Sequence, residues 1–363
     1  MKSKYALLIF LSLLVQFHCL SQEKLKVVIA GLSHDHVNRM LDKNKSGDII
    51  IIGIAEPNRQ LSNLKKTTYG LPDTLFYTSL AAALRKTKPD LVMVFNAPVQ
   101  HLAAIETCMP LHIPVMVEKP LCYSDADAAK IKTLSEKHNT KVYTNYPSLW
   151  YSSFIALLNK RKEAGSITKM EMHGGHRGPV EIGCSKDFLN WLTDPVKNGG
   201  GAIIDFGCYG ASIMTELMEG KAPLSVYATT RRLKPQVYPK VDDDATIVLE
   251  YAGATGIIEA SWNWPYTIMD AEVYGNNAYL HASQINGADT VYLQLKNETE
   301  TRTEKITSPQ YQDEIEYLTA VIKKGAADDN QLMELNRNIV VVQILAAAKR
   351  SAAEGRKIVL KKY

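Results

Sequence analysis

Cysteine is scarce in this chain, with five residues among 363. No two of them form a CxxC pair, and none of their spacings matches a known set of zinc ligands. So few cysteines in a chain of this length exclude a disulfide-stabilised scaffold, although they leave room for a single bridge.

An excess of charge of one sign is also missing. Lysine and arginine number 42 against 38 aspartate and glutamate residues, which gives a formal net charge of +4. No basic stripe with interleaved aromatic residues stands out, so the sequence indicates no nucleic-acid partner. Hydrophobic residues make up 46% of the chain, enough to build the cores of two soluble domains.

Long apolar runs are missing except near the N-terminus. Two lysines precede the run Ala6–Phe17, whose 12 residues fall short of the roughly 20 that span a bilayer. Cys19-Leu20-Ser21 then offers small residues at the positions that a signal peptidase reads. We predict a signal peptide over 1–21, export to the periplasm of a Gram-negative host, and no stable membrane anchor after cleavage. A short uncleaved anchor is the alternative.

Short β-branched strands alternate with helix-like segments from Leu25 to Asn145. This alternation predicts βαβ units and a parallel sheet. About six strands fit into the segment, the size of one doubly wound domain that binds a dinucleotide. In such sheets ligands lie beyond the carboxyl ends of the strands, so the residues that follow strand ends are the first candidates for a site.

The first strand runs into Gly31-Leu32-Ser33-His34-Asp35-His36, a tight turn before a helix. Such a turn aims backbone N–H groups and a helix N-terminus at an anion. The dinucleotide fingerprint would be G-x-G-x-x-G, and here Ser33 and His36 stand where the two later glycines would be. Two roles are equally open for His34 and His36. They contact phosphate or substrate, or they are surface or helix-capping residues.

Glu56 ends the second strand, 25 residues past Gly31. An acid about 20 residues after this turn bonds the ribose 2′-hydroxyl, and its charge would repel a 2′-phosphate. Glu56 therefore favours NAD over NADP, a preference that the nearby Arg59 moderates. A solvated loop glutamate is the alternative.

The apolar run Val115–Val117 predicts a buried strand that stops at Glu118 and Lys119, because Pro120 cannot continue a ladder. A lysine is thereby held at the end of a rigid element, where a ligand would lie. An ordinary strand-to-helix turn with two solvated charges is the alternative, and the rest of the sequence has to decide.

In the second half, a helix over Leu149–Gly165 precedes strands in which polar and apolar residues alternate. The alternation suits a sheet with one packed face. Helices are predicted over Ser308–Lys324 and Glu334–Glu354. Trp262 and Trp264 suit either a sugar-binding site or a position in the core or at an interface. We favour the core or an interface.

Three glycines, Gly199–Gly201, allow a close approach of the backbone to a ligand. Asp205 and Tyr209 follow, and their spacing of four predicts that they share one face of a single helix. His176 and Arg177 follow the end of a strand and are expected to face the same cleft.

The order and spacing of these features resemble those of the Gfo/Idh/MocA oxidoreductases. The Glu-Lys-Pro triplet is the most recognisable signature of that family, and the glycine-rich turn before Asp205 and Tyr209 resembles its second, in the form of the glucose–fructose oxidoreductase branch. The Gly31 turn departs from the family pattern, which leaves open how a cofactor is gripped. The features that carry the resemblance are the Gly31 turn, Glu56, Pro98 with His101, Glu118-Lys119-Pro120 and Asn145-Tyr146-Pro147.

The resemblance implies an α/β Rossmann domain over 22–145. Over 146–363 it implies an α+β domain with an open, mostly antiparallel sheet that binds substrate and forms oligomers, with a C-terminal helix that packs back on the first domain. It further implies NAD as cofactor, a small carbohydrate as substrate, no metal, and a homo-oligomer, either a dimer or a tetramer. The implied cofactor-binding residues are Gly31, Leu32, Ser33, His34, Glu56, Asn96, Pro98, His101, Glu118, Lys119 and Asn145.

Hydride transfer requires a base on the hydroxyl of the reacting carbon. By the resemblance, Lys119 touches that oxygen, Tyr209 carries the proton with its pKa lowered by the Lys119 charge, and Asp205 orients the substrate or Lys119. The implied substrate contacts are His176, Arg177 and Tyr209. His34 is a further candidate acid or base.

Three hypotheses follow. The first is an exported NAD-dependent oxidoreductase that acts on a sugar, polyol or glycoside at a carbinol carbon. The second is a redox-neutral glycosidase or lyase that retains NAD and works through a transient keto sugar, which export favours because NAD is not supplied outside the cytoplasm. The third is a non-catalytic binding protein, for which the altered glycine turn is the main argument.

Overall fold

The computed structural model describes residues 24–285, 288–296, 302–303 and 309–360. The predicted signal peptide over 1–21 lies outside the described residues. Within them, no helix combines the length and apolarity that crossing a bilayer requires.

The first sheet contains six parallel strands in the order β3-β2-β1-β4-β5-β6. Its order reverses between β1 and β4, so the loops after these two strands diverge and leave a crevice at their carboxyl ends. The prediction of about six parallel strands is confirmed. The strands are β1 (Leu25–Ala30), β2 (Ile49–Ala55), β3 (Phe76–Tyr77), β4 (Leu91–Val94), β5 (Val115–Glu118) and β6 (Val142–Asn145).

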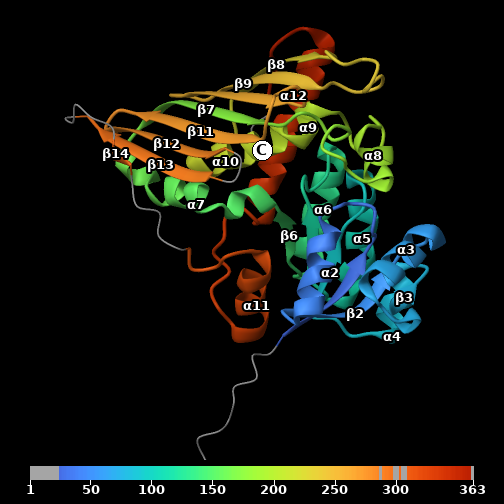
Figure 1. Cartoon of the computed structure of the whole chain (residues 1–363). Helices are drawn as coiled ribbons and strands as arrows, with labels where there is room; N and C mark the ends of the chain where they lie inside the picture. Colours follow the sequence, from blue (N-terminus) through green and yellow to red (C-terminus); the bar gives the residue numbers. More distant parts are fainter. Residues whose placement is uncertain (1–23, 286–287, 297–301, 304–308, 361–363) are drawn as a thin grey trace, which may run out of the picture.

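Helices cover both faces of this sheet (Figure 1). Apolar residues of α2 and α3 share one core with β1 and β2, while residues of α4, α5 and α6 form another with β4 and β5. The strands are thus buried on both sides, which explains their nearly continuous apolar sequences. The helices are α2 (Val37–Ser46), α3 (Arg59–Tyr69), α4 (Leu80–Lys86), α5 (His101–Cys108) and α6 (Asp125–His138).

The second sheet contains nine strands in the order β14-β13-β12-β11-β7-β10-β9-β8-β15. Only the β10–β7 pair is parallel, so the predicted mostly antiparallel sheet is confirmed. The strands are β7 (Ile167–Gly175), β8 (Ser225–Arg231), β9 (Asp244–Glu250), β10 (Thr255–Ser261), β11 (Ile268–Gly275), β12 (Ala278–Ile285), β13 (Ala288–Leu295), β14 (Arg302–Thr303) and β15 (Ile358–Val359).

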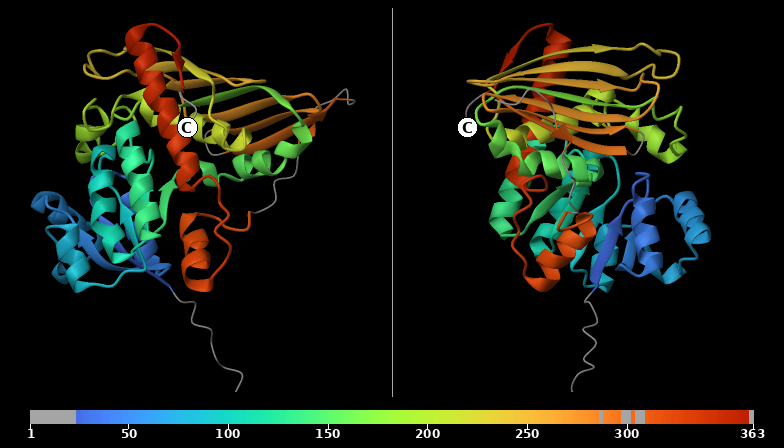
Figure 2. Two further views of the ribbon diagram at one scale, coloured as in Figure 1. Left: turned by 180° about the vertical axis from the view of Figure 1, so that it is seen from behind. Right: turned by 60° about the vertical axis from the view of Figure 1, so that its left-hand side comes forward.

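One face of the second sheet is packed and the other is open. In β9 and β11 buried residues alternate with half-exposed ones, as period-two side-chain geometry requires. Helices α7 (Ser152–Asn159) and α10 (Gly207–Leu217) lie on the packed side, between the sheet and the first domain (Figures 1 and 2).

The last two long helices return to the first domain. In α11 (Glu314–Lys324), Ile315 and Leu318 belong to the core that contains β1. In α12 (Leu335–Glu354), Val342 joins the core behind β4 and β5, while Leu345 joins the core of the second domain. The predicted return of the C-terminal helix is therefore present, and α11 makes a second return that the sequence did not indicate.

Several predicted helix boundaries were wrong. The helix expected over Leu149–Gly165 is α7 alone, flanked by short 3₁₀ turns at 147–150 and 161–164. The helix expected from Ser308 begins only at Glu314, because Asp313 caps it by accepting from the N–H groups of Ile315 and Glu316.

Candidate active site

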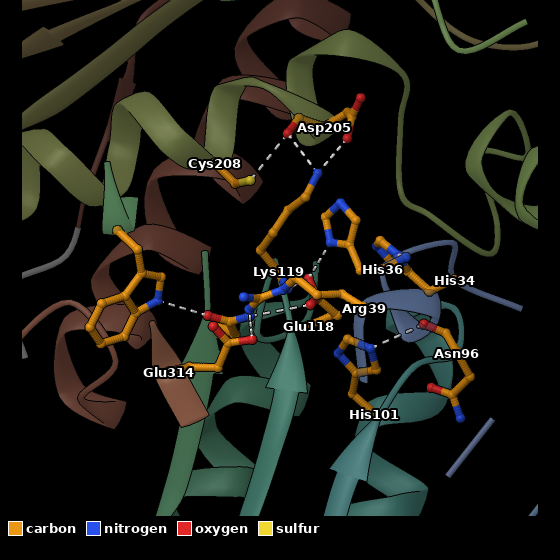
Figure 3. A network of polar contacts seen from close by, with 12 residues as sticks. His34, His36, Arg39, Asn96, His101, Glu118, Lys119, Asp205, Cys208 and Glu314 are labelled. Atoms are coloured by element: carbon orange, nitrogen blue, oxygen red, sulfur yellow. Dashed lines mark hydrogen bonds and ion pairs between the residues drawn. The ribbon is translucent and has the colours of Figure 1, made fainter. Parts of the chain in front are cut away.

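The catalytic candidates meet where the two domains face each other. Lys119 follows β5 of the first domain, and Asp205 ends α9 (Ala202–Asp205) of the second. Lys119 Nζ lies 2.5 Å from Asp205 Oδ1 and also donates to the Asp205 carbonyl at 3.2 Å. Both residues are 7% exposed, so this is a buried ion pair between the domains (Figure 3).

Each charge of the pair stabilises the other. Burial is the largest single effect and lowers the pKa of Lys119, but the charge and hydrogen bond of Asp205, together with smaller contributions from neighbouring groups, hold that pKa well above its ordinary value. Burial is the largest single effect and raises the pKa of Asp205, but Lys119, His176 and Trp262 together outweigh it, and the pKa of Asp205 is lowered. Both groups therefore stay ionised across the neutral range.

Trp262 holds the second carboxylate oxygen of Asp205. Its indole Nε1 donates to Asp205 Oδ2 at 3.0 Å, and the side chain is fully buried. Its expected place in the core is confirmed, but its bond to Asp205 was missed. No signal in the sequence could have shown that contact, because 57 residues separate the two partners.

Tyr209 differs from the sequence-based expectation in its helix and in its pKa. Phe206 interrupts the expected single helix, so Asp205 ends α9 and Tyr209 belongs to α10. Lys119 Nζ lies 4.9 Å from the centroid of the Tyr209 ring, so the lysine meets the face of the ring. Burial raises the pKa of Tyr209 and the Lys119 charge only partly offsets it, so the expected lowering of this pKa was wrong.

His176 lies in the same charged neighbourhood. Its Nδ1 accepts from the Gly178 N–H at 2.9 Å, so the neutral ring carries its proton on Nε2. Burial lowers the pKa of His176, with Asp205 opposing and Lys119 assisting, which keeps the ring neutral. A neutral imidazole close to Asp205 and Lys119 is suited to exchange protons.

The strand end that carries His176 is tied to the Trp262 segment by a residue that the sequence analysis did not select. Lys234 Nζ donates to the carbonyl of Arg177 at 2.6 Å and to that of Trp262 at 2.7 Å. The side chain of Arg177 is exposed and forms no ion pair with the described residues. The structure thus places Arg177 at the predicted strand end without a contact to the Lys119–Asp205 pair.

The turn after β1 has the shape of a dinucleotide loop despite its missing glycines. Gly31 has φ +85°, and a Cβ atom there would lie 2.8 Å from Cβ of Asn96. The Leu32 N–H donates to Glu56 Oε2 at 2.8 Å, so the acid at the end of β2 braces the turn. Glu56 Oε1 accepts from the Asn58 N–H at 2.8 Å, which leaves further lone pairs on both oxygens.

His34 supports the turn from inside. It is 1% exposed, and its ring packs 4.6 Å from Phe188 and 5.4 Å from Trp191, both in α8 (Lys186–Leu192) of the second domain. Trp191 Nε1 donates to the Ser33 carbonyl at 3.4 Å. Burial, with the charges of His36 and Lys119, lowers the pKa of His34 well below its ordinary value, so the ring is neutral.

Glu118 is buried beside Lys119 and is held by His36 and Asn145. His36 Nδ1 lies 3.1 Å from Glu118 Oε2, and Asn145 Nδ2 donates to Glu118 Oε1 at 3.4 Å (Figure 3). His36 is thus a partner of Glu118, and its predicted contact with phosphate or substrate stays a prediction. His34, His36 and Glu118 also present ligand atoms within 4.8 Å of one another, but the hydrogen bonds inside the group account for their approach without a metal.

His101 is a support rather than a cofactor contact, which corrects the sequence-based role. It is fully buried, with Nδ1 3.1 Å from the Leu121 carbonyl and Nε2 3.3 Å from the Asn96 carbonyl. Both ring nitrogens are occupied by the backbone, so His101 ties the loop after β5 to the loop after β4. Pro98 is likewise buried, at the start of a 3₁₀ turn over 98–100.

A cavity of about 480 Å³ opens at the point where the strand order reverses. It lies beside the Gly31 turn, and Asp187 of α8 closes it from the second domain. Asn96 lines this cavity, and its Oδ1 is buried without a hydrogen-bond partner among the described residues. The residues that line it include Gly31, Ser33, Glu56, Asn58, Asn96 and Gln100.

These features fit a dinucleotide. The N–H groups of Gly31, Leu32, His34 and His36 already have acceptors, which leaves those of Ser33 and Asp35 for a pyrophosphate. Glu56 offers acceptors to ribose hydroxyls, and Lys119 stands at the far end of the crevice. Fold and site together define the class, a two-domain oxidoreductase with a nucleotide-binding first domain.

Comparisons with known proteins make the assignment specific. A family model described as "Oxidoreductase family, NAD-binding Rossmann fold" matches residues 25–146, and one described as "GFO/IDH/MocA C-terminal domain" matches residues 157–281. The chain belongs to the Gfo/Idh/MocA family of oxidoreductases, as the sequence resemblance predicted.

Trans-1,2-dihydrobenzene-1,2-diol dehydrogenase of Xenopus laevis is 25% identical over 177 residues, which are 48% of this chain and 50% of that protein. The chain thus matches about half the length of this relative. The structure of aldose-aldose oxidoreductase from Caulobacter crescentus, complexed with glycerol, superposes with a TM-score of 0.77 at 20% identity. The match covers 93% of this chain and 100% of that chain. An oxidoreductase from Agrobacterium radiobacter, solved in complex with NAD⁺, L-tartaric acid and magnesium, superposes with a TM-score of 0.75 at 18% identity. The match covers 93% of this chain and 98% of that chain. These two structures share the fold.

Proposed function

We propose that the protein oxidises a carbinol carbon of a sugar, polyol or glycoside to a carbonyl, or catalyses the reverse reduction of the carbonyl, with NAD as hydride carrier. The observation that carries this proposal is the buried Lys119–Asp205 pair at the carboxyl end of β5, where the second domain meets the far end of the dinucleotide crevice. The relatives support the substrate class, because their printed names include an aldose-aldose oxidoreductase and a dihydrodiol dehydrogenase.

Bound NAD supplies the acceptor or donor of hydride. Lys119 then places a fixed positive charge beside the substrate oxygen, where an alkoxide gains the most from it. Asp205 and Trp262 fix the direction of the Lys119 side chain. We assign the proton exchange to His176, whose neutral ring lies near this pair, in place of Tyr209, whose pKa is raised by burial.

We propose NAD rather than NADP because of Glu56. Its carboxylate lines the cavity at the end of β2 and braces the turn that would hold the pyrophosphate. A 2′-phosphate would approach this carboxylate and Asp187 of α8, which also lines the cavity.

We also propose export and self-association. The basic, apolar and small-residue segments over 1–21 support a signal peptide and a periplasmic location. The open face of the second sheet supports a homo-oligomer, because an uncovered sheet face with aromatic residues favours a protein partner.

The proposed oxidation predicts that Lys119→Met removes turnover. The variant keeps most of the side-chain volume but loses the charge, and we expect a fall in kcat of about a hundredfold or more, because stabilisation of an oxyanion is usually worth that much. NADH absorbance with a panel of sugars and polyols measures the rate. Lys221→Met, an exposed lysine outside the site, serves as the control. Equal rates for wild type and Lys119→Met would refute the role of Lys119.

A redox-neutral reaction with retained NAD is the second candidate, and the contact of α8 with the turn favours it. Trp191 and Phe188 enclose the dinucleotide loop, so a bound cofactor would leave slowly. The two candidates separate when glycosides are supplied. Release of the aglycone without net NADH supports the redox-neutral reaction, whereas steady NADH formation supports the oxidation.

A further inference from the structure

A second cavity, of about 420 Å³, lies away from the Lys119–Asp205 pair. The turn at Gly199 and Gly200, the ends of β8 and of the loop before β9, and the last turns of α12 form its walls. In Figure 1, α12 stands beside β8 and α9. Neither Lys119 nor Asp205 lines this cavity, so it is separate from the candidate active site.

Its lining is strongly basic. Four cationic side chains reach it from three segments of the fold: Arg231, Arg232, Lys240 and Lys349. Arg231, Arg232 and Lys240 are exposed and Lys349 is half-buried. In the part of the chain that the structure describes, none of the four forms an ion pair, whereas several other half-buried lysines have a carboxylate partner.

The acid that lines the cavity, Asp242, can offset only one of these four charges. Asp242 Oδ1 accepts from the Gly201 N–H at 2.8 Å, and Oδ2 accepts from the Ile203 N–H at 2.7 Å. Both carboxylate oxygens are thus engaged with the first turn of α9. The cavity keeps a net positive charge, and an anion would be attracted to it.

Lys349 is the half-buried member of the set. Its Nζ lies 4.9 Å from the centroid of the Tyr123 ring and has no carboxylate partner among the described residues. Burial lowers the pKa of Lys349, and Asp242 only partly opposes this effect. A half-buried ammonium is costly without an anion, so a ligand that supplied one would relieve that cost.

The cavity also offers backbone donors. Gly199 and Gly200 are buried, and neither of their N–H groups donates to an acceptor among the described residues. Buried N–H groups in proteins nearly always have an acceptor. Guanidinium forks, an ammonium and N–H groups without acceptors together suit a tetrahedral oxyanion.

We propose that this cavity binds the phosphate or sulfate ester of a small molecule, at a site distinct from the Lys119 centre. The free oxyanion would fill only part of the volume, which leaves room for a small organic group. The site does not depend on the proposed reaction, because none of its residues is assigned to it.

Calorimetric titration of the purified full chain tests the proposal. The ligands are inorganic phosphate, inorganic sulfate, glucose 6-phosphate and glucose 6-sulfate, with sodium chloride used to hold the ionic strength constant. We expect saturable binding of at least one ester, and the preference between the two esters distinguishes phosphate from sulfate. Arg231→Gln should weaken the binding about tenfold, the effect of losing one charge-assisted hydrogen bond.

Arg85→Gln is the matched control, since Arg85 is also exposed, forms no ion pair with the described residues and lies far from this lining. It should bind like the wild type. Lys349→Met should also lose affinity, and if it fails to fold Arg231→Gln decides alone. Absence of saturable binding to all four ligands overturns the proposal, and so does equal affinity of the wild type and Arg231→Gln.

Discussion

At the scale of single residues, this protein uses charge pairs to set protonation states. Lys119 and Asp205 keep each other ionised, while His34 and His176 are kept neutral by burial. The site therefore presents one fixed cation and neutral imidazole groups near neutral pH. Such a division of roles matches a reaction that needs both a charged stabiliser and a proton acceptor.

A second set of charges, on the open sheet face, predicts a pH dependence of stability. Asp270 lies between His173 (3.2 Å) and His281 (2.6 Å), which lowers the pKa of Asp270 and raises the pKa of both histidines. Because the pKa values of the two histidines are raised in the folded state, their contribution to stability is fully present below the pKa of the unfolded state. It is lost as pH rises through the pKa of the folded state. The pKa of Asp270 is lowered, so its contribution to stability is present above the pKa of the unfolded state and is lost only in strong acid.

We therefore expect Asp270→Asn to reduce the loss of stability between pH 6 and about pH 8. Without the carboxylate the histidine pKa values fall back, and their contribution, at most about 1 kcal/mol at such a half-exposed site, disappears. Urea unfolding of the wild type and the variant at both pH values measures the difference. Parallel pH profiles of the two proteins would contradict this interpretation.

At the scale of elements, short segments between the domains set the geometry of the site. The interruption at Phe206 separates Asp205 from Tyr209, and α8 lies against the turn after β1. Because α8 belongs to the second domain, the cofactor crevice is closed by an element that is far from it in sequence.

Trp191→Ala should speed the release of bound NAD about tenfold. The change removes the packing of Trp191 on His34 and its bond to the Ser33 carbonyl, and an aromatic pair is worth about 0.5–1.5 kcal/mol. Stopped-flow fluorescence of NADH displaced by excess NAD⁺ measures the rate. Lys186→Ala changes an exposed residue of the same helix and should leave the rate unaltered, and an equal change in both variants would argue against a closing role for α8.

At the scale of the whole molecule, the two domains share their cores. Leu318 of α11 is fully buried in the core of β1, although it stands near the end of the chain, and α12 contributes to both domain cores. We expect the two domains to unfold together, since neither core is complete without the C-terminal helices.

Leu318→Ala should lower the free energy of unfolding by about 2–5 kcal/mol, the usual cost of a cavity at a buried leucine. Denaturant unfolding followed by tryptophan fluorescence and by circular dichroism measures the loss. Leu64→Ala, at a leucine that is 58% exposed, should change it by less than about 0.5 kcal/mol. A loss of that small size for Leu318→Ala would show that α11 adds little to the first domain.

The amino-acid sequence by itself determined the local pattern: the alternation of strands and helices up to Asn145, the lysine at the end of β5, and the family resemblance. These features depend on residues that are close in the chain, so their periodicity and spacing reveal them. The family models confirm that part of the interpretation.

The tertiary structure alone decided which side chains meet and in what protonation state. The bond from Trp262 to Asp205, the role of His36 as partner of Glu118, the support role of His101 and the raised pKa of Tyr209 all depend on contacts across 20 or more residues or on burial. A charge expected to lower the pKa of Tyr209 does act on it, but the loss of solvent is the larger effect. Solvent exclusion belongs to the folded chain as a whole, which is why no local pattern in the sequence could supply it.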